Sequence, residues 1–178
     1  MPRYRLLLEY DGRGFVGWQQ QPHGRSVQGE LERAILAFSG ETVQAVASGR
    51  TDAGVHASGQ VVHFDLRRWA APERVAGALN AHLRPLPIAV LEVRCTRDNF
   101  HARFDALRRH YRYTILNRRA PPALLAGRVW HVPAPLDAER MHAAAQWLVG
   151  RHDFTSFRAA SCQAASPVKT LQHLHVRR

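Results

Sequence analysis

The feature that most constrains the fold is the change of hydrophobic period along residues 3–94. Four strand-like runs, short and apolar or alternating, lie at residues 3–10, 42–48, 60–66 and 88–94. Apolar residues recur at helical spacing over 27–38, where Ser26 is a suitable N-cap and Gly40 a suitable stop. Pro72 opens a second helical stretch. The order β-α-β-β-α-β predicts an α+β fold of the ferredoxin-like kind, a four-stranded antiparallel sheet with two helices on one face.

The pattern begins again in the second half of the chain. Residues 108–117 alternate as a strand, with Tyr111, Tyr113 and Ile115 on one face. After a proline-rich connection, Asp137 is a suitable N-cap for a helix. Two further strands are expected, at 152–159 and at 166–178. This β-α-β-β order predicts a second ferredoxin-like half that lacks its last helix and strand. We expect one domain over residues 1–105 and an incomplete one over 106–178.

The chain is strongly basic. It has 25 Lys+Arg against 14 Asp+Glu, a formal net charge of +11, and Lys169 is the only lysine. A GC-rich genome would explain arginine in place of lysine, but not the excess of positive charge. Between Arg94 and Arg119 there are eight arginines and two aspartates, interleaved with histidines and tyrosines. Guanidinium groups contact phosphates and aromatic rings stack on bases, so this stretch favours a nucleic-acid partner. A charged edge strand that blunts sheet pairing is the alternative.

Several classes of protein are excluded by composition. No run approaches 18 apolar residues, so the sequence predicts no membrane span. The apolar run at the N-terminus is too short for a signal peptide. Cys95 and Cys162 have neither metal-binding nor redox spacing, so no metal held by a cysteine cluster is expected. A cytoplasmic location follows as the default.

The most unusual segment is SGRTDAGVHA at residues 48–57, which joins two predicted strands. Arg50 and Asp52 lie two residues apart, so in extended chain their side chains point the same way and can form an ion pair. A nearby cation favours an ionised carboxylate, which can act as a nucleophile or a base. The same spacing also suits an ordinary structural ion pair in a turn, and the spacing leaves both readings open.

GRTDAGVHA, at residues 49–57, resembles the signature of the TruA-type tRNA pseudouridine synthases. The resemblance covers essentially the whole chain. Further segments that resemble the family are EYDGRGFVGWQQQ (9–21), SVQGELERAI (26–35), GQVVHFD (59–65), NFHARFDALRRHYRY (99–113) and HDFTSFRA (152–159). The resemblance to this family implies two ferredoxin-like halves around a central cleft. It also implies conversion of uridine to pseudouridine in the tRNA anticodon stem-loop, with tRNA as partner, no cofactor and a homodimeric assembly.

The resemblance also implies roles for single residues. Asp52, in a catalytic loop over 48–58, matches the family's catalytic carboxylate. Tyr111 matches the active-site tyrosine, whose ring would stack on the uracil and whose hydroxyl would assist proton transfer. Arg50 would hold Asp52 and help to keep the target base out of the helix.

The basic stretch around Tyr111 is expected to border the RNA. Besides Tyr111, the residues predicted to bind substrate are His101, Arg103, Arg109 and Arg112. For His101 and Arg103, plain surface charge is an equally good interpretation. No metal-binding residues are predicted, because His173 and His175 are too few for a metal site.

Three other residues are expected to be structural. His56 and His63 flank the catalytic loop and are expected to be packed or hydrogen-bonded, while Trp18 is expected in the core.

Family members generally continue beyond the position of Arg178, with a basic strand–helix block resembling VRNIVG. The sequence therefore predicts a shortened synthase with weak or no turnover. The competing hypothesis is a non-catalytic RNA-binding module that uses the same basic face. A nuclease is a weaker hypothesis, because no two histidines have a convincing acid–base spacing.

Overall fold

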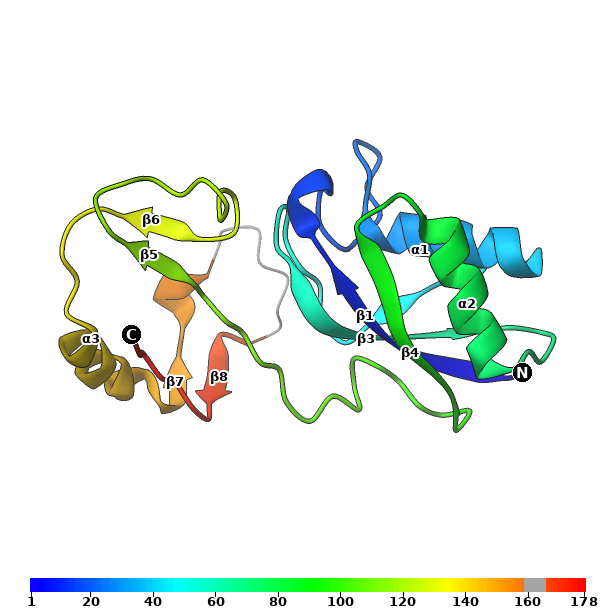
Figure 1. Ribbon diagram of the computed structural model, residues 1–178. Helices are drawn as coiled ribbons and strands as arrows, with labels where there is room; N and C mark the ends of the chain where they lie inside the picture. The colour runs from blue at the N-terminus through cyan, green and yellow to red at the C-terminus, as the bar shows by residue number, and fades with distance from the viewer. Residues whose placement is uncertain (159–165) are drawn as a thin grey trace. The chain divides into compact units, whose positions relative to one another are not determined.

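The computed structural model describes residues 1–158 and 166–178 of the chain. The chain divides into two compact units, Met1–Tyr111 and Arg112–Arg178 (Figure 1). Cys162 and the last residue of the strand predicted at 152–159 lie outside the described residues. In the described parts of the chain, no helix is long and apolar enough to cross a membrane.

The first unit is a mixed α/β structure built on one sheet. Its elements are β1 (Arg3–Tyr10), the 3-10 turn η1 (Gly12–Gly14), α1 (Val27–Ser39), β2 (Val46–Ala47), β3 (Ala57–Asp65), α2 (Pro72–Leu83) and β4 (Ile88–Thr96). The strands pair in the order β2-β3-β1-β4, and every pairing is antiparallel. The predicted order of strands and helices along residues 3–94 is therefore confirmed.

Two of these strands differ in length from the prediction. The strand predicted over 42–48 is paired only at Val46–Ala47. The backbone N–H of Ala45 donates to the Glu32 side chain on α1 at 2.9 Å, so this part of the chain bonds the helix and not the sheet. β3 begins at Ala57, three residues earlier than predicted.

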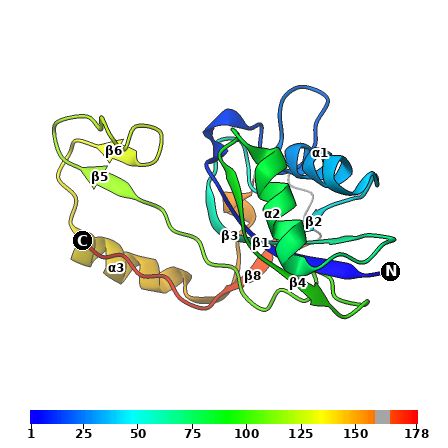
Figure 2. The ribbon, with the colours of Figure 1, turned by 45° about the vertical axis from the view of Figure 1, so that its right-hand side comes forward.

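Both helices cover the same face of the sheet (Figures 1 and 2). Alternate residues of β1 are buried, and the arginines between them lie on the opposite face, as the two-residue period of a strand requires. A continuous core joins β1, β3 and β4 to both helices. Its largest fully buried side chains include Tyr4, Leu6, Leu8, Leu31, Ile35, Phe64, Val75 and Leu79.

The ends of the helices follow the sequence signals. The hydroxyl of Ser26 accepts a hydrogen bond from the backbone N–H of Gly29 at 3.1 Å, which caps α1. Gly40 ends this helix in the left-handed region, with φ of +72°. Pro72 occupies the first turn of α2, where a missing N–H costs nothing. All three predicted boundaries are confirmed.

The second unit has shorter elements and two small sheets. They are β5 (Ile115–Asn117), β6 (Trp130–Val132), α3 (Ala138–Ala145), η2 (Gln146–Leu148), β7 (Gly150–Asp153), η3 (Thr155–Phe157) and β8 (Val168–Leu171). β5 and β6 pair in parallel, and β7 and β8 pair antiparallel. Asp137 caps α3 by accepting from the backbone N–H of Arg140 at 3.0 Å, as predicted.

The strands of the second unit correct the prediction in three respects. The strand expected over 108–117 is present only at 115–117, and the one expected over 166–178 ends at Leu171. β6 was not predicted, because its three residues are embedded in a proline-rich connection. The single sheet expected of a ferredoxin-like half is replaced, in the described residues, by two two-stranded sheets. No described residue of this unit is buried.

Candidate active site

Residues 48–56 join β2 to β3 and carry the predicted catalytic pair. The side chains of Arg50 and Asp52 are exposed to solvent. The chain turns immediately after Asp52: the backbone N–H of Val55 donates to the Asp52 carbonyl at 3.1 Å, and Gly54 adopts a φ of +78°. The Asp52 carboxylate thus lies at the start of a tight turn, accessible from outside the protein.

The segment from Tyr10 to Trp18 holds this loop in place. The hydroxyls of Tyr10 and Thr51 are hydrogen-bonded at 2.8 Å. The Thr51 carbonyl accepts from the backbone N–H of Trp18 at 2.9 Å, and the N–H of Gly54 donates to the Phe15 carbonyl at 3.4 Å. Residues on both sides of Asp52 are therefore tied to the same segment. Trp18 is buried, which confirms its predicted place in the core.

Two glycines make this close approach possible. A Cβ atom on Gly12 would lie 2.1 Å from the Val55 carbonyl oxygen, and one on Gly17 would lie 2.7 Å from the Thr51 carbonyl oxygen. Gly17 also has a φ of +113°, which strongly favours glycine. No side chain fits at either position. The glycines in DGRGFVGW are thus the sequence signal for a backbone that packs against the loop.

Two polar side chains beneath the loop were missed by the sequence reasoning. Burial raises the pKa of the Tyr10 phenol, and its hydroxyl shares a hydrogen bond with the Thr51 hydroxyl. Gln60 on β3 is buried and binds the first two residues of the loop. Its amide accepts from the Ser48 hydroxyl at 2.9 Å and donates to the Gly49 carbonyl.

The predicted ion pair between Arg50 and Asp52 is wrong. Among the described residues, no ion pair or hydrogen bond joins these two side chains. Thr51 is bonded inward at its side chain and its carbonyl, and the side chains on either side of it extend separately into solvent. Because both side chains are exposed, an ion pair between them would also add little to the stability of the fold.

The histidines that flank the loop are structural, as expected. His56 Nδ1 accepts from the backbone N–H of Gly12 at 3.1 Å and lies 3.1 Å from Asp11 Oδ1. His63 is buried, and its Nδ1 accepts from the backbone N–H of Ala102 at 3.2 Å. Burial, with a smaller contribution from nearby cations, lowers the pKa of the His63 imidazole, which favours the neutral form needed to accept this bond.

The segment that carries His101 and Arg103 is organised by its own hydrogen bonds. His101 Nδ1 accepts from the backbone N–H groups of Arg103 and Phe104 at 3.2 and 3.3 Å. Asp105 accepts from the His101 backbone N–H at 3.1 Å and from the Arg97 guanidinium at 3.0 Å. The His101 ring therefore stabilises a turn, while the Arg103 side chain is exposed.

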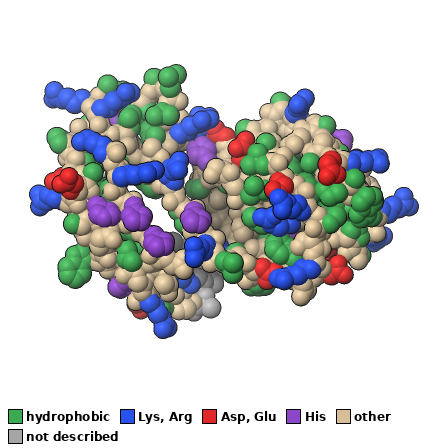
Figure 3. All heavy atoms as spheres, turned by 60° about the horizontal axis from the view of Figure 1, so that its bottom comes forward, with side chains coloured by type: hydrophobic (Ala, Val, Ile, Leu, Met, Phe, Trp, Pro, Cys, Tyr) green, Lys and Arg blue, Asp and Glu red, His purple; other side chains and the backbone are tan. Residues whose placement is uncertain are grey.

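Tyr111 and Arg112 lie before β5, outside any strand, and both are exposed. The Tyr111 side chain is 86% exposed, so its ring is free to stack on a planar ligand. Tyr113 contacts Trp130 edge to face, with the ring centroids 6.1 Å apart. Figure 3 shows Lys, Arg and His side chains gathered on one face of the second unit, where a polyanion would be attracted.

Histidines also gather near the end of the chain. The rings of His173 and His175 are stacked with centroids 6.2 Å apart, and His175 stacks on His142 at 5.8 Å. Within residues 1–158 and 166–178, no three His, Cys, Asp or Glu side chains are grouped as a metal site requires.

Comparison with known proteins identifies one family. A family model described as tRNA pseudouridine synthase matches residues 7–105 and 144–178. The first of these stretches contains the Asp52 loop and most of the segment that holds it.

Individual relatives match over the whole chain. The tRNA pseudouridine synthase A of Rhodospirillum centenum is 61% identical over 178 residues, which are 100% of this chain and 73% of that protein. The proteins of the same name from Methylobacterium sp. (strain 4-46) and Methylorubrum populi are 60% and 59% identical, again over 100% of this chain and 71% of theirs.

Proposed function

The chain belongs to the tRNA pseudouridine synthase family, and on this premise we propose that it converts uridine to pseudouridine in the anticodon stem-loop of tRNA. The reaction breaks the N1–C1′ glycosidic bond, turns the uracil and joins C5 to C1′. C5 loses a proton and N1 gains one, so substrate and product are isomers. The proposal requires no external oxidant, reductant or energy source.

Asp52 is the proposed catalytic carboxylate. The observation that carries this assignment is the way in which its loop is held: an exposed carboxylate on backbone that is tied to Trp18 and Phe15 on either side. A reacting group that is already in position avoids the entropic cost of being ordered during the reaction. The target nucleotide must leave its stack to reach the carboxylate, because C1′ and C5 are inaccessible inside a helix.

Tyr111 and Arg50 are proposed to complete the site. The exposed Tyr111 ring suits stacking on the uracil, and its hydroxyl suits proton transfer at C5. The exposed Arg50 guanidinium is proposed to contact the extruded nucleotide or its phosphate. His101, Arg103 and Arg112 are proposed to add contacts to the RNA backbone.

The test is tritium release from tRNA that carries tritium at C5 of uridine. We expect release by the wild-type chain at no more than the weak rate that its shortened sequence predicts, and a further loss of about 100-fold or more in Asp52→Asn, the scale of removing a group that takes part in the chemistry. Binding of tRNA should be unchanged in this variant. Glu73→Gln, which alters an exposed carboxylate on α2, is the control and should keep full activity.

The competing function is RNA binding without catalysis, which the exposed basic residues also favour. It predicts salt-sensitive tRNA binding by the wild type and by Asp52→Asn, and no tritium release by either. Release that survives Asp52→Asn would reject the assignment of Asp52.

Assembly and location follow as further parts of the proposal. We propose a homodimer in the cytoplasm, where tRNA is found. Large exposed hydrophobic side chains in the second unit, including Trp130 and Phe157, support self-association. Sedimentation equilibrium of the purified chain tests the dimer.

A further inference from the structure

Arg109 binds the protein's own backbone at the base of the Asp52 loop. Its Nε and Nη2 atoms donate to the Ser48 carbonyl at 3.1 and 2.7 Å, and Nη2 also donates to the Arg103 carbonyl at 3.2 Å. The planar guanidinium fork thus places two N–H groups on one oxygen, a geometry that lysine cannot reproduce.

The Ser48 carbonyl is a sensitive point of the loop. The backbone N–H of Ser48 still pairs with the Val61 carbonyl of β3 at 2.8 Å, so this residue is where the sheet ends and the loop begins. Gln60 binds the Ser48 hydroxyl and the next carbonyl from within the protein. Arg109 binds the Ser48 carbonyl from the solvent side, so the two side chains hold adjacent groups of Ser48 and Gly49, and Asp52 follows four residues after Ser48.

The segment that carries Arg109 is itself anchored to the sheet. Arg3 on β1 donates to the Phe100 carbonyl at 2.7 Å and forms an ion pair with Asp65 on β3. The backbone N–H of Ala102 donates to the buried His63 on β3. The segment is therefore fixed to the sheet at Phe100 and Ala102. The bond from Arg109 to the Arg103 carbonyl links this fixed segment to the Asp52 loop.

We propose that Arg109 is a positioning residue, which fixes the base of the Asp52 loop and couples that loop to the Phe100–Arg103 segment. The assignment rests on the proposed function, since it takes Asp52 as the group to be positioned. It replaces the expectation that Arg109 binds substrate, because its Nε and Nη2 groups donate to the Ser48 and Arg103 carbonyls and not to an RNA phosphate.

The experiment compares Arg109→Ala, Arg109→Lys and Arg108→Ala in the full chain. Arg108 is the control, because it is an adjacent exposed arginine and its loss changes the charge equally. The first readout is hydrogen exchange of peptides that cover residues 48–56. Arg109→Ala should exchange about tenfold faster there, the scale of one lost charged hydrogen bond, Arg109→Lys should recover part of the protection, and Arg108→Ala should match the wild type.

The second readout separates positioning from substrate binding. In Arg109→Ala, kcat should fall about tenfold while KM stays within about twofold, since one charged hydrogen bond orders the loop but not the RNA. If Arg109 instead neutralised a phosphate, the salt dependence of tRNA binding would weaken by about one unit of slope. Unchanged loop exchange in Arg109→Ala, with or without such a loss of slope, overturns the proposal.

Hydrogen exchange also keeps this inference distinct from the proposed function. If no protein releases tritium, the proposed activity of this chain fails, whereas faster exchange at 48–56 in Arg109→Ala still supports the positioning contact. If the alanine variant does not fold, Arg109→Lys carries the test, because it keeps the charge and loses only the two-pronged bond.

Discussion

The unit Met1–Tyr111 buries a continuous apolar core, whereas no described residue of Arg112–Arg178 is buried. The two units also differ in net charge. The first unit has 15 Lys+Arg against 11 Asp+Glu, a net charge of +4, and the second has 10 against 3, a net charge of +7. The smaller unit therefore combines more net charge with less burial.

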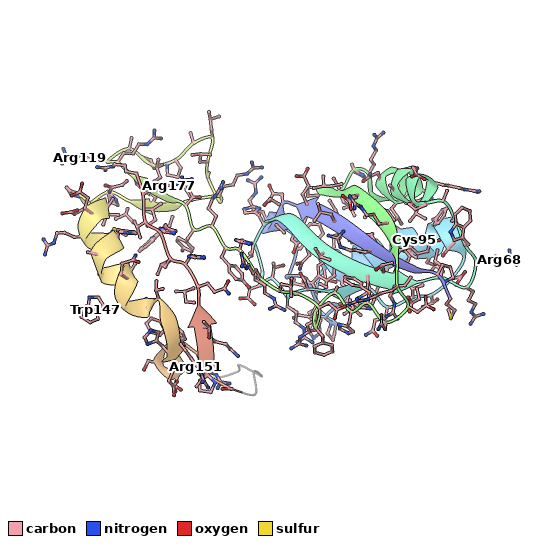
Figure 4. All side chains as sticks on the ribbon, turned by 90° about the horizontal axis from the view of Figure 1, so that it is seen from below. Arg68, Cys95, Arg119, Trp147, Arg151 and Arg177 are labelled. Carbon is pink, nitrogen blue, oxygen red and sulfur yellow. The ribbon has the colours of Figure 1, made fainter. Side chains whose placement is uncertain are left out.

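This difference separates stability from recognition. The first unit gains its stability from side chains withdrawn from water, and this allows its loop at 48–56 to be held rigidly. The second unit presents aromatic and basic groups to solvent, which suits contact with RNA but contributes little to folding. Trp147, labelled in Figure 4, projects outward from the short helical segment of this unit.

The largest expected effect compares the two units by removing one leucine from each. Leu6 is fully buried on β1, so Leu6→Ala should lower the free energy of unfolding by about 2–5 kcal/mol. Leu124 is 97% exposed, and Leu124→Ala should change the free energy of unfolding by less than about 0.5 kcal/mol. Urea denaturation measures both. Equal losses would show that the second unit is packed as tightly as the first.

A smaller effect is expected from two asparagines with similar roles. Asn80 on α2 exchanges two hydrogen bonds with the buried backbone of Val90 on β4, at 2.9 and 2.8 Å. Asn80→Ala leaves the backbone N–H and carbonyl of Val90 without partners and should lower the free energy of unfolding by about 1–3 kcal/mol.

Asn117 on β5 is the counterpart in the second unit. It donates to the Val132 carbonyl at 2.8 Å and accepts from the Leu136 N–H at 3.1 Å. Water reaches this site, so Asn117→Ala should cost less than about 1 kcal/mol. Hydrogen exchange in β4 and β5 compares the two variants, and a greater loss of protection in β5 would reverse the comparison.

Acidification should weaken the first unit through His63 and Asp65. Burial lowers the pKa of the His63 imidazole below its ordinary value of 6.5. The unfolded chain therefore binds more protons below pH 6.5, and stability that is complete above this pH declines until the folded-state pKa is passed. His63→Gln should remove this decline, and denaturation between pH 7.5 and about 5 detects it. A decline that persists in the variant would assign it to another group.

Asp65 acts in a lower pH window. Its hydrogen bond with Arg3 lowers the pKa of the Asp65 carboxyl below the ordinary value of 3.8. The resulting stability is present above that value and is lost as the pH falls through the folded-state pKa. Asp65→Asn should abolish this acid-dependent loss, so its denaturation midpoint should change less below pH 4 than that of the wild type.

The smallest energetic effect is expected at the exposed Trp147, which can be compared with the buried Trp18 by fluorescence. Trp18 is 3% exposed and Trp147 is 84% exposed. Trp147→Phe should remove emission that acrylamide quenches readily and change stability by less than about 0.5 kcal/mol. Trp18→Phe should remove emission that is shielded from acrylamide. Similar quenching of the two residues would contradict the assigned burial.

The order of elements in the first unit was predictable because each part of the signal is local. The alternation of Tyr4, Leu6 and Leu8, the cap at Ser26 and the stop at Gly40 depend on neighbours within a few residues. The strand at 108–117 failed for the converse reason. The alternation at Tyr111 and Tyr113 is a local pattern that suits a strand with one buried and one exposed face. A strand also needs a neighbour to pair with, and in the described structure β6 pairs only with Ile115–Asn117.

In the candidate site, too, some features were predictable from local sequence and others depend on distant contacts. The loop and its carboxylate were identified from residues that are close in sequence, and the motif that contains Asp52 lies within a stretch matched by the family model. The Arg50–Asp52 ion pair was also inferred from local spacing and is wrong: both side chains are exposed, while Thr51 between them is bonded to Tyr10 and Trp18, more than 30 residues away. No local pattern contains those contacts.

The amino-acid sequence was sufficient for the order of strands and helices in the first unit, the position of the loop and the excess of positive charge, since periodicity, capping and composition act over short distances. Only the tertiary structure revealed that Gly12 and Gly17 allow the backbone to approach the loop, and that Gln60 and Arg109 hold its first two residues, Ser48 and Gly49. These contacts join parts of the chain that folding alone brings together. Their geometry depends on the packing of the whole sheet, which no segment specifies locally.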